Sequence, residues 1–240
     1  MRLAYRGHRN VGSAIVLRVL FLAAIAGIAV FFLLPTALMA VYRVPLARPV
    51  SAPMVADMLT GQGYVRDWVP LDRISPALVA SVMMSEDARF CSHHGVDWNA
   101  LNTVIDDAMD GDATRGASTI PMQTVKNLFL WQSRSYIRKV FEIPLAYAAD
   151  FILGRRRLME IYLNIAQWGP GEIYGVEAAA RRAFHRHAAE LTEWQAALLA
   201  VTLPNPDLRD PAKPSRGLVR LARIIRDRAR NAGPYVGCVR

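Results

Sequence analysis

Two adjacent acids, Glu86 and Asp87, come shortly after the apolar stretch VASVMM and are candidates for acid–base chemistry. The stretch predicts a helix that ends near Glu86, where the helix dipole favours cations rather than acids. A glutamate whose surroundings raise its pKa toward neutrality is the usual general acid or base in sugar chemistry. Acid pairs are also common on protein surfaces, so this pair alone does not distinguish catalysis from a solvated surface.

A second cluster, RGASTIPMQTVKN, runs over residues 115–127. It joins a glycine-led loop to a helix start through Ser118 and Thr119, so that free backbone N–H groups, two hydroxyls and Lys126 could gather around an anion. The loop lacks G-K-[ST] and is therefore not a P-loop. A plain helix cap beside a surface lysine is the alternative interpretation, and the cluster taken singly favours it.

A basic stretch between residues 133 and 164 contains Arg138 and Glu142, which are four residues apart. This spacing places both on one face of a helix. The pair is either a surface ion pair worth about 0.3–0.5 kcal/mol or a carboxylate that holds a phosphate-binding arginine, and the spacing leaves both open. The same stretch also carries Arg134, Lys139, Arg155, Arg156, Arg157 and Glu160.

Histidine and cysteine spacing indicates neither a metal site nor a nucleophile. The pairs His93–His94 and His185–His187 lack the H-E-x-x-H spacing, and we predict that His93 is a hydrogen-bonding structural group. Two cysteines, Cys91 and Cys238, are too few for a disulfide scaffold or a zinc site. They could pair if the fold brings them together, but we expect two unrelated thiols.

The apolar stretch of residues 19–42 carries no charged side chain and is long enough for a helix to span a bilayer. Arg2, Arg6, Arg9 and Arg18 precede it without an acid among them, which places the N-terminus in the cytoplasm by the positive-inside rule. We predict a cytoplasmic basic tail over residues 1–18 and an uncleaved transmembrane anchor over 19–42. A cleaved signal peptide is the alternative, but the apolar run is long for one and no A-x-A motif stands at its end.

The remaining residues predict a juxtamembrane linker over 43–63, with one short helix around 52–59, and a mainly α domain over 64–240. A short strand is expected within 64–71. Serine and proline at 75 and 76 then start the helix that delivers Glu86. Further helices are predicted around 98–109, 121–131, 135–153, 156–164, 177–184, 192–203 and 215–231, with loops at 111–117 and 167–175.

The last predicted helix is amphipathic and basic. Its apolar side carries Leu218, Leu221, Ile224 and Ile225, and much of the rest carries Arg216, Arg220, Arg223 and Arg226. We favour an ordinary packed helix with a solvated face over a role at the membrane surface.

Composition bounds the class of protein. The chain has 240 residues, of which 53% are hydrophobic, so it is long and apolar enough to fold around a core. A formal net charge of +9 indicates an anionic partner: nucleic acid, lipid headgroups or a phosphorylated substrate. The anchor favours the partners at the membrane, and we predict no nucleic-acid partner.

Taken in order, the clusters resemble the motifs of the glycosyltransferase family that polymerises peptidoglycan, most closely its monofunctional biosynthetic transglycosylases. The same family forms the transglycosylase domain of bifunctional penicillin-binding proteins. EDARFCSHHGVD matches E-D-x-x-F-x-x-H-x-G-x-D, and GASTIPMQTVKN matches G-x-S-T-x-x-Q-Q-x-x-K-N. RKVFE matches R-K-x-x-E, and RRRLMEIYLN follows K-x-x-I-L-E-x-Y-L-N. The resemblance extends over roughly residues 64–235.

Two residues depart from these motifs. Met122 stands where the family has its first glutamine, which puts the detailed loop contacts in doubt. Arg155 stands where the family has a lysine, a mild change because a cation is kept for phosphate.

The resemblance implies a lysozyme-like α domain at the outer face of the bacterial inner membrane, facing the periplasm. The substrate would be lipid II, with the growing glycan strand as donor. Glu86 would be the general base that activates the acceptor 4-hydroxyl, and inversion would give a β-1,4 bond with loss of undecaprenyl pyrophosphate. Glu142 would be the second essential carboxylate, which positions cations or a divalent metal. The substrate-binding residues would be Asp87, Ser118, Thr119, Gln123, Lys126, Asn127, Arg134, Arg138 and Arg155.

The sequence itself requires no cofactor, and a divalent cation, Mg or Mn, stays open at Glu142. No transpeptidase domain follows the last predicted helix, so we expect cross-linking by a separate transpeptidase, with cell-wall synthesis or division proteins as partners. The alternatives are a membrane-anchored lytic muramidase and a catalytically silent scaffold that binds glycan or lipid. A muramidase would need no pyrophosphate pocket, so Ser118, Lys126 and Arg138 argue against it.

Overall fold

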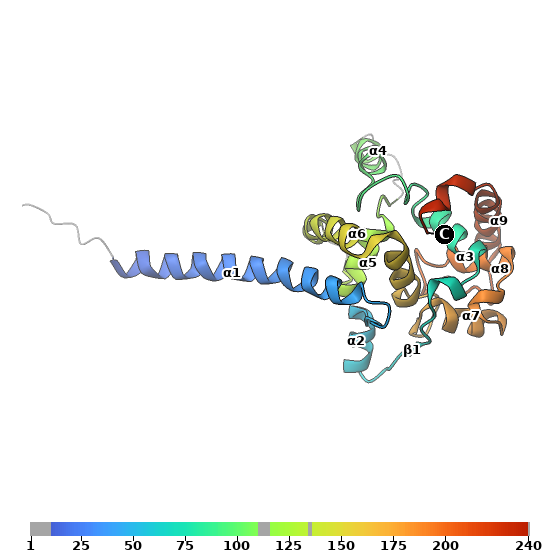
Figure 1. The fold of residues 1–240 in the computed structure, drawn as a ribbon, viewed down its shortest axis with the longest axis horizontal. Coiled ribbons are helices and arrows are strands. Elements are labelled where there is room, and N and C mark those ends of the chain that lie inside the picture. The colour runs from blue at the N-terminus through green and yellow to red at the C-terminus, as the bar shows by residue number, and fades with distance from the viewer. Residues whose placement is uncertain (1–10, 110–115, 134–135, 240) are drawn as a thin grey trace, which may run out of the picture.

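A computed structural model describes residues 11–109, 116–133 and 136–239 of the chain. A long helix, α1 (Val11–Tyr42), leads to a mainly helical body at its C-terminal end (Figure 1). The mainly α class predicted from the sequence is confirmed. In the described part, β-structure is confined to two short strands and isolated bridges.

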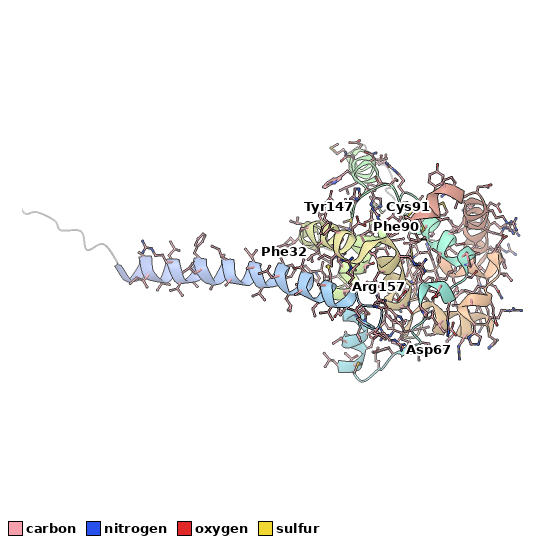
Figure 2. All side chains as sticks on the ribbon, viewed as in Figure 1. Phe32, Asp67, Phe90, Cys91, Tyr147 and Arg157 are labelled. Carbon is pink, nitrogen blue, oxygen red and sulfur yellow. A yellow bond between two sulfur atoms is a disulfide. The ribbon has the colours of Figure 1, made fainter. Side chains whose placement is uncertain are left out.

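Helix α1 contains the predicted membrane-spanning segment. Residues Ala14–Tyr42 have a mean hydropathy of 2.7 over their most apolar window, none of which is buried by the protein. Figure 2 shows the side chains of α1 projecting on all sides along most of its length. The helix begins before residue 19 because a single arginine, Arg18, does not interrupt helical hydrogen bonding. Its composition and exposure suit a membrane anchor.

The end of α1 is attached to α6 (Tyr136–Ile165). The ring of Phe141 lies 4.9 Å from that of Phe31 and 6.2 Å from that of Phe32, measured between centroids. Arg157 donates hydrogen bonds to the carbonyls of Tyr42 at 2.8 Å and Val44 at 3.0 Å. These contacts join the end of α1 to the body directly.

The segment after α1 forms α2 (Ala52–Leu59), which confirms the short helix predicted there. Ser51 caps it, with Oγ accepting from the backbone N–H of Met54. Strand β1 (Val65–Arg66) then pairs in parallel with β2 (Ile173–Tyr174), in the register Val65 to Ile173. The predicted strand near residue 64 is therefore confirmed, and it ties this segment to the loop after α6.

Helix α3 (Pro76–Glu86) is the buried centre of the body. Seven consecutive residues, Leu78 through Met84, are buried, which explains why this stretch shows no amphipathic period. It packs against α8 (Glu193–Ala200) and α9 (Arg216–Arg230). A short 3-10 turn, η1 (Leu71–Arg73), precedes α3. The helix delivers Glu86 from a rigid support.

Helices α5 (Ile120–Phe129) and α6 pack along one another, and Gln123 of α5 contacts Glu86 at the end of α3. The sequence predicts two helices between residues 135 and 164, and α6 does break at Gly154, whose φ of 72° and ψ of 162° are not helical. Glycine adopts this conformation without a Cβ penalty. Helix α4 (Trp98–Met109) stands at the edge of the body (Figure 1), and α7 (Val176–Phe184) with η2 (Ala188–Glu190) completes it.

Helix α9 packs as the sequence analysis favours, with Leu218, Ala222 and Ile225 buried against the body. Leu221 and Ile224 differ from expectation because they stay 38% and 44% exposed. Their exposure leaves an apolar strip of α9 beside the cleft described below.

The expectation that Cys91 and Cys238 are unrelated thiols is wrong, because the two form a disulfide with their Cα atoms 5.6 Å apart. After α9 the chain turns back through η3 (Gly233–Val239), with Val236 and Val239 buried. This return brings Cys238 to the loop that follows α3. A sequence separation of 147 residues hides such a pairing, since only the packing of the C-terminal segment creates it.

Candidate active site

Glu86 lies in the wall of an open cleft of about 700 Å³. Its position follows from α3, which is buried until its last turn and ends at the cleft. The cleft is lined by Ser85, Glu86, Gly116, Ser118, Gln123, Lys126, Arg138, Lys139, Val201, Leu203, Pro204, Arg209, Leu221, Ile224, Ile225 and Arg228. The walls of the cleft are therefore formed by the end of α3 and by residues of α5, α6 and α9.

The carboxylate of Glu86 accepts two hydrogen bonds. Ser85 Oγ donates to Oε1 at 3.0 Å, and Gln123 Nε2 donates to Oε2 at 3.2 Å. Burial raises the pKa of Glu86, and the negative charge of Asp87 adds to the rise, while the two hydrogen bonds and the positive charge of Arg209 oppose it. The net shift is upward, which brings the pKa closer to neutrality and suits a general base.

The wall formed by α5 and α6 is cationic. Glu142 is fully buried, with Oε1 2.6 Å from Nε of Arg138 and Oε2 2.7 Å from Nζ of Lys139. Lys139 Nζ also donates to Ser118 Oγ at 3.0 Å. Burial lowers the pKa of Lys126, and the nearby charges of Arg138 and Lys139 lower it further. Three cations thus face one carboxylate on this wall, and the excess positive charge fits an anionic ligand.

The residues around Glu142 do not fit a divalent metal ion. Both of its oxygens are occupied by cationic side chains, which would repel a metal. The described part of the chain holds no cluster of three or more His, Cys, Asp or Glu side chains that could bind one. A divalent ion normally takes several oxygen ligands, whereas each oxygen of Glu142 already contacts a cationic side chain.

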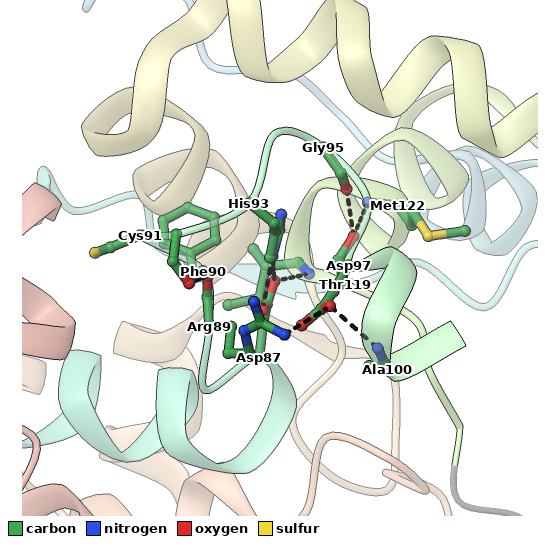
Figure 3. Close-up of polar contacts among 12 residues, drawn as sticks. Asp87, Arg89, Phe90, Cys91, His93, Gly95, Asp97, Ala100, Thr119 and Met122 are labelled. Carbon is green, nitrogen blue, oxygen red and sulfur yellow. Dashed lines mark hydrogen bonds and ion pairs between the residues drawn. The ribbon is translucent and has the colours of Figure 1, made fainter. Parts of the chain in front are cut away.

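Asp87 is not among the residues that line the cleft, and its side chain contacts the loop that follows α3 (Figure 3). Its buried carboxylate contacts His93 Nε2 at 2.9 Å and accepts from the backbone N–H of Ile120 at 3.0 Å. The contact confirms that His93 is a structural hydrogen-bonding group. Asp87 therefore joins the loop after α3 to the start of α5, and its geometry does not support the predicted substrate contact.

Thr119 is likewise used within the protein. It caps α5, accepting from the backbone N–H of Met122, while its hydroxyl donates to the carbonyl of Gly95 at 2.6 Å (Figure 3). The Met122 side chain is 1% exposed and belongs to the core. Met122, the departure from the family motif, is therefore not part of the cleft lining.

Arg155, predicted to bind substrate, also lies outside the cleft lining. Its Nε pairs with Asp150 at 2.9 Å, its two terminal nitrogens donate to the carbonyls of Phe90 and His93, and its guanidinium stands over the Phe90 ring. All of its groups are thus engaged in fastening the loop after α3 to the break in α6. The geometry supports a positioning role in place of phosphate binding.

Asn127 lines a smaller pocket of about 180 Å³ that shares Gln123, Lys126, Leu203 and Pro204 with the main cleft. The cleft therefore continues past Lys126 toward Asn127. Of the other predicted site residues, the structure brings Glu86, Ser118, Gln123, Lys126 and Arg138 together in the cleft. Arg134 lies outside the described residues.

Sequence reasoning missed three cationic cleft residues: Lys139, Arg209 and Arg228. Lys139 matches the R-K-x-x-E motif, but no binding role was predicted for it. Arg209 lies in a proline-rich loop and donates to the carbonyl of Val201 at 2.7 Å, a contact that no local pattern indicates. The amphipathic pattern of the last helix predicted its apolar side, but it did not predict that Leu221, Ile224 and Ile225 of that side line the cleft.

Comparison with known proteins defines the class. Residues 54–229 match the family model described as Transglycosylase. A protein of Brucella melitensis biotype 1, named biosynthetic peptidoglycan transglycosylase, is 60% identical over 95% of this chain and 97% of its own length. A protein of the same name from Agrobacterium fabrum is 62% identical over 86% of this chain and 91% of its own. The chain belongs to the transglycosylase family, with its lysozyme-like fold, which confirms the resemblance seen in the sequence.

Proposed function

We propose that the protein is an inverting glycosyltransferase that polymerises lipid II into β-1,4-linked peptidoglycan strands and releases undecaprenyl pyrophosphate. One observation carries this function: Glu86, with a raised pKa, shares a cleft with the cationic wall of Lys126, Arg138 and Lys139. A base and a site for a diphosphate leaving group are the two requirements of the reaction. The family membership and the names of its relatives support the same activity.

In the proposed reaction, Glu86 accepts the proton of the acceptor 4-hydroxyl as its oxygen attacks the anomeric carbon of the donor sugar. The bond between that carbon and the pyrophosphate oxygen breaks, and its electron pair leaves with the pyrophosphate. Attack from the opposite face converts the α linkage into a β-1,4 bond. The leaving group needs charge stabilisation more than a proton, so Lys126, Arg138 and Lys139 are its proposed ligands.

Glu142 has a positioning role in this proposal. Its contacts with Arg138 and Lys139 hold both cations toward the cleft and reduce the repulsion between them. Ser118 contributes a hydroxyl beside Lys139, and Asn127 extends the lining toward the neighbouring pocket. Because their geometry favours internal contacts, we assign Asp87, Thr119 and Arg155 to the support of the site.

Helix α1 supports a single-pass arrangement in the bacterial inner membrane. We propose that the N-terminus is cytoplasmic and the catalytic domain periplasmic, on the basis of the arginines that precede the apolar run. An anchored enzyme meets a lipid-linked substrate in two dimensions. The growing glycan strand, membrane lipid, a separate transpeptidase and other cell-wall synthesis or division proteins are the proposed partners.

The test is glycan synthesis from purified lipid II by the full-length protein in detergent. We expect polymer from the wild type and a loss of about 1,000-fold in the Glu86→Gln variant, in the range of general-base removal. Glu193→Gln, which changes an exposed glutamate outside the cleft, is the control and should retain full activity. Absence of polymer from the folded wild type would reject the function. Hydrolysis of preformed strands would identify the muramidase, and glycan binding without reaction the scaffold.

A further inference from the structure

Three helices supply a hydrogen-bonded series that ends on Glu86. Tyr162 of α6 donates from Oη to Oε1 of Gln123 on α5 at 3.1 Å, and Gln123 Nε2 donates to Oε2 of Glu86 on α3 at 3.2 Å. Tyr162 is 1% exposed, so its hydroxyl has little access to water. Among the described residues, Gln123 accepts the hydrogen bond from this hydroxyl.

The chemistry of the three groups fixes the direction of the series. An ionised carboxylate only accepts hydrogen bonds, so Gln123 must present its NH₂ group to Glu86. Its carbonyl oxygen then faces Tyr162, which must donate. The same NH₂ group donates to the carbonyl of Ser118 at 3.3 Å, a second contact that requires this orientation.

We propose that Tyr162 is a positioning residue for glycosyl transfer: its hydroxyl holds the Gln123 amide with NH₂ toward Glu86, which keeps the carboxylate oriented and ionised. The inference rests on the proposed function and deepens it, because it assigns Gln123 to the base instead of to substrate. Without the tyrosine hydroxyl, the carbonyl oxygen of Gln123 loses its donor, and only the contacts of its NH₂ group with Ser118 and Glu86 still hold the amide in place.

Tyr162 is suited to this role because it stays protonated. Burial raises its pKa, and the negative charges of Glu86 and Asp87 raise it further. The hydroxyl therefore remains a donor over the working pH range. Removal of the Tyr162 hydroxyl alone leaves the charged groups around Glu86 in place. These groups are Asp87 after α3, Lys126 on α5, Arg138 and Lys139 on α6, Arg209 after α8 and Arg228 on α9.

The test compares Tyr162→Phe with the wild type in lipid II polymerisation. We expect kcat to fall roughly tenfold, the size of one neutral hydrogen bond, with KM nearly unchanged. The acidic limb of the pH profile should move to higher pH, because a Gln123 amide that no longer donates steadily to Glu86 stops lowering the pKa of the base, and a base works only when ionised. Tyr147→Phe removes a hydroxyl that accepts from Trp98 outside the cleft, and should show neither change.

A double-mutant cycle separates this role from a loss of packing. Gln123→Met removes the amide that the tyrosine holds, so Tyr162→Phe should lower kcat no further in that background. Additive losses in kcat, or an unmoved acidic limb in a folded Tyr162→Phe enzyme, would overturn the proposal. If Tyr162→Phe lowers the melting temperature too far for assay, the pH profile of Gln123→Met provides the test. An acidic limb that does not move in this variant would contradict the hydrogen-bonded series from Tyr162 through Gln123 to Glu86. A wild type that makes no polymer would reject the proposed function instead.

Discussion

The buried carboxylate of Glu142 lies 2.6 Å from Nε of Arg138, one helical turn away on α6. Arg138 also donates to the carbonyls of Trp131 and Ser133, so its guanidinium is held from several sides. The cations of the cleft are therefore ordered before any anion arrives. Such preorganisation lowers the cost of stabilising a leaving group because little rearrangement remains for the reaction itself.

Replacement of Glu142 by glutamine should weaken both stability and activity. The variant removes the buried negative charge beside Arg138 and Lys139, so we expect the free energy of unfolding to fall by about 3 kcal/mol. Polymerisation should fall by about 100-fold as the cations move. Urea unfolding and lipid II turnover measure the two effects. Glu193→Gln, which breaks an exposed pair with Arg230, should cost under about 0.5 kcal/mol, and equal losses in both variants would contradict this role.

The pH dependence of polymerisation should report the raised pKa of Glu86. Activity should rise with pH along an acidic limb that lies above the usual glutamate range, since burial raises the pKa and the base must be ionised. The stability of the fold should change with pH in the opposite direction to the activity. A raised folded-state pKa stabilises the fold at low pH, and this contribution is lost as pH rises through it. Glu86→Gln should therefore melt above the wild type at neutral pH while losing activity; a lower melting temperature would argue against the pKa shift.

The disulfide should contribute substantially to stability. It joins residues 147 positions apart, and closing a long loop restricts the unfolded chain. We expect the double variant Cys91→Ser, Cys238→Ser to lose about 2–4 kcal/mol in unfolding free energy. Calorimetry with and without reductant measures this. Reductant should lower the melting temperature of the wild type and leave the double variant unchanged; a shift in both would point to another cause.

Gly95 should not tolerate a side chain. Its φ is +72°, and an added Cβ would stand 2.8 Å from backbone atoms of Ala146 and Tyr147 on α6. Gly95→Ala should cost about 3 kcal/mol and lower activity, because the loop also holds Thr119 at the start of α5. Gly61→Ala is the matched control, with φ of +77° and open space around the new Cβ, and should cost about 1 kcal/mol. Equal costs by thermal melting would show that the close approach is unimportant.

Local patterns predicted those features that depend on near neighbours in the chain. The uncharged apolar run after Arg18 specifies a long apolar helix because its length and hydropathy leave few alternatives. Pro76 and the following apolar residues start a buried helix that ends at Glu86. The motif spacings then identified Lys126 and Arg138 among the cations of the cleft, and Arg138 and Glu142 meet through helical geometry alone.

Tertiary structure decided which motif residues face the cleft and which support it. Asp87 and Arg155 carry charges that the sequence interprets as ligands, yet their partners, Ile120, His93 and Asp150, fold back around them. The Cys91–Cys238 bond and the Tyr162–Gln123 contact likewise join distant segments. A sequence determines local helices through spacing and polarity, whereas the direction of a side chain depends on which elements pack beside it. For this protein, the sequence alone determined the long apolar helix and most of the other helices, and packing alone decided which charged side chains line the cleft and which make contacts within the protein.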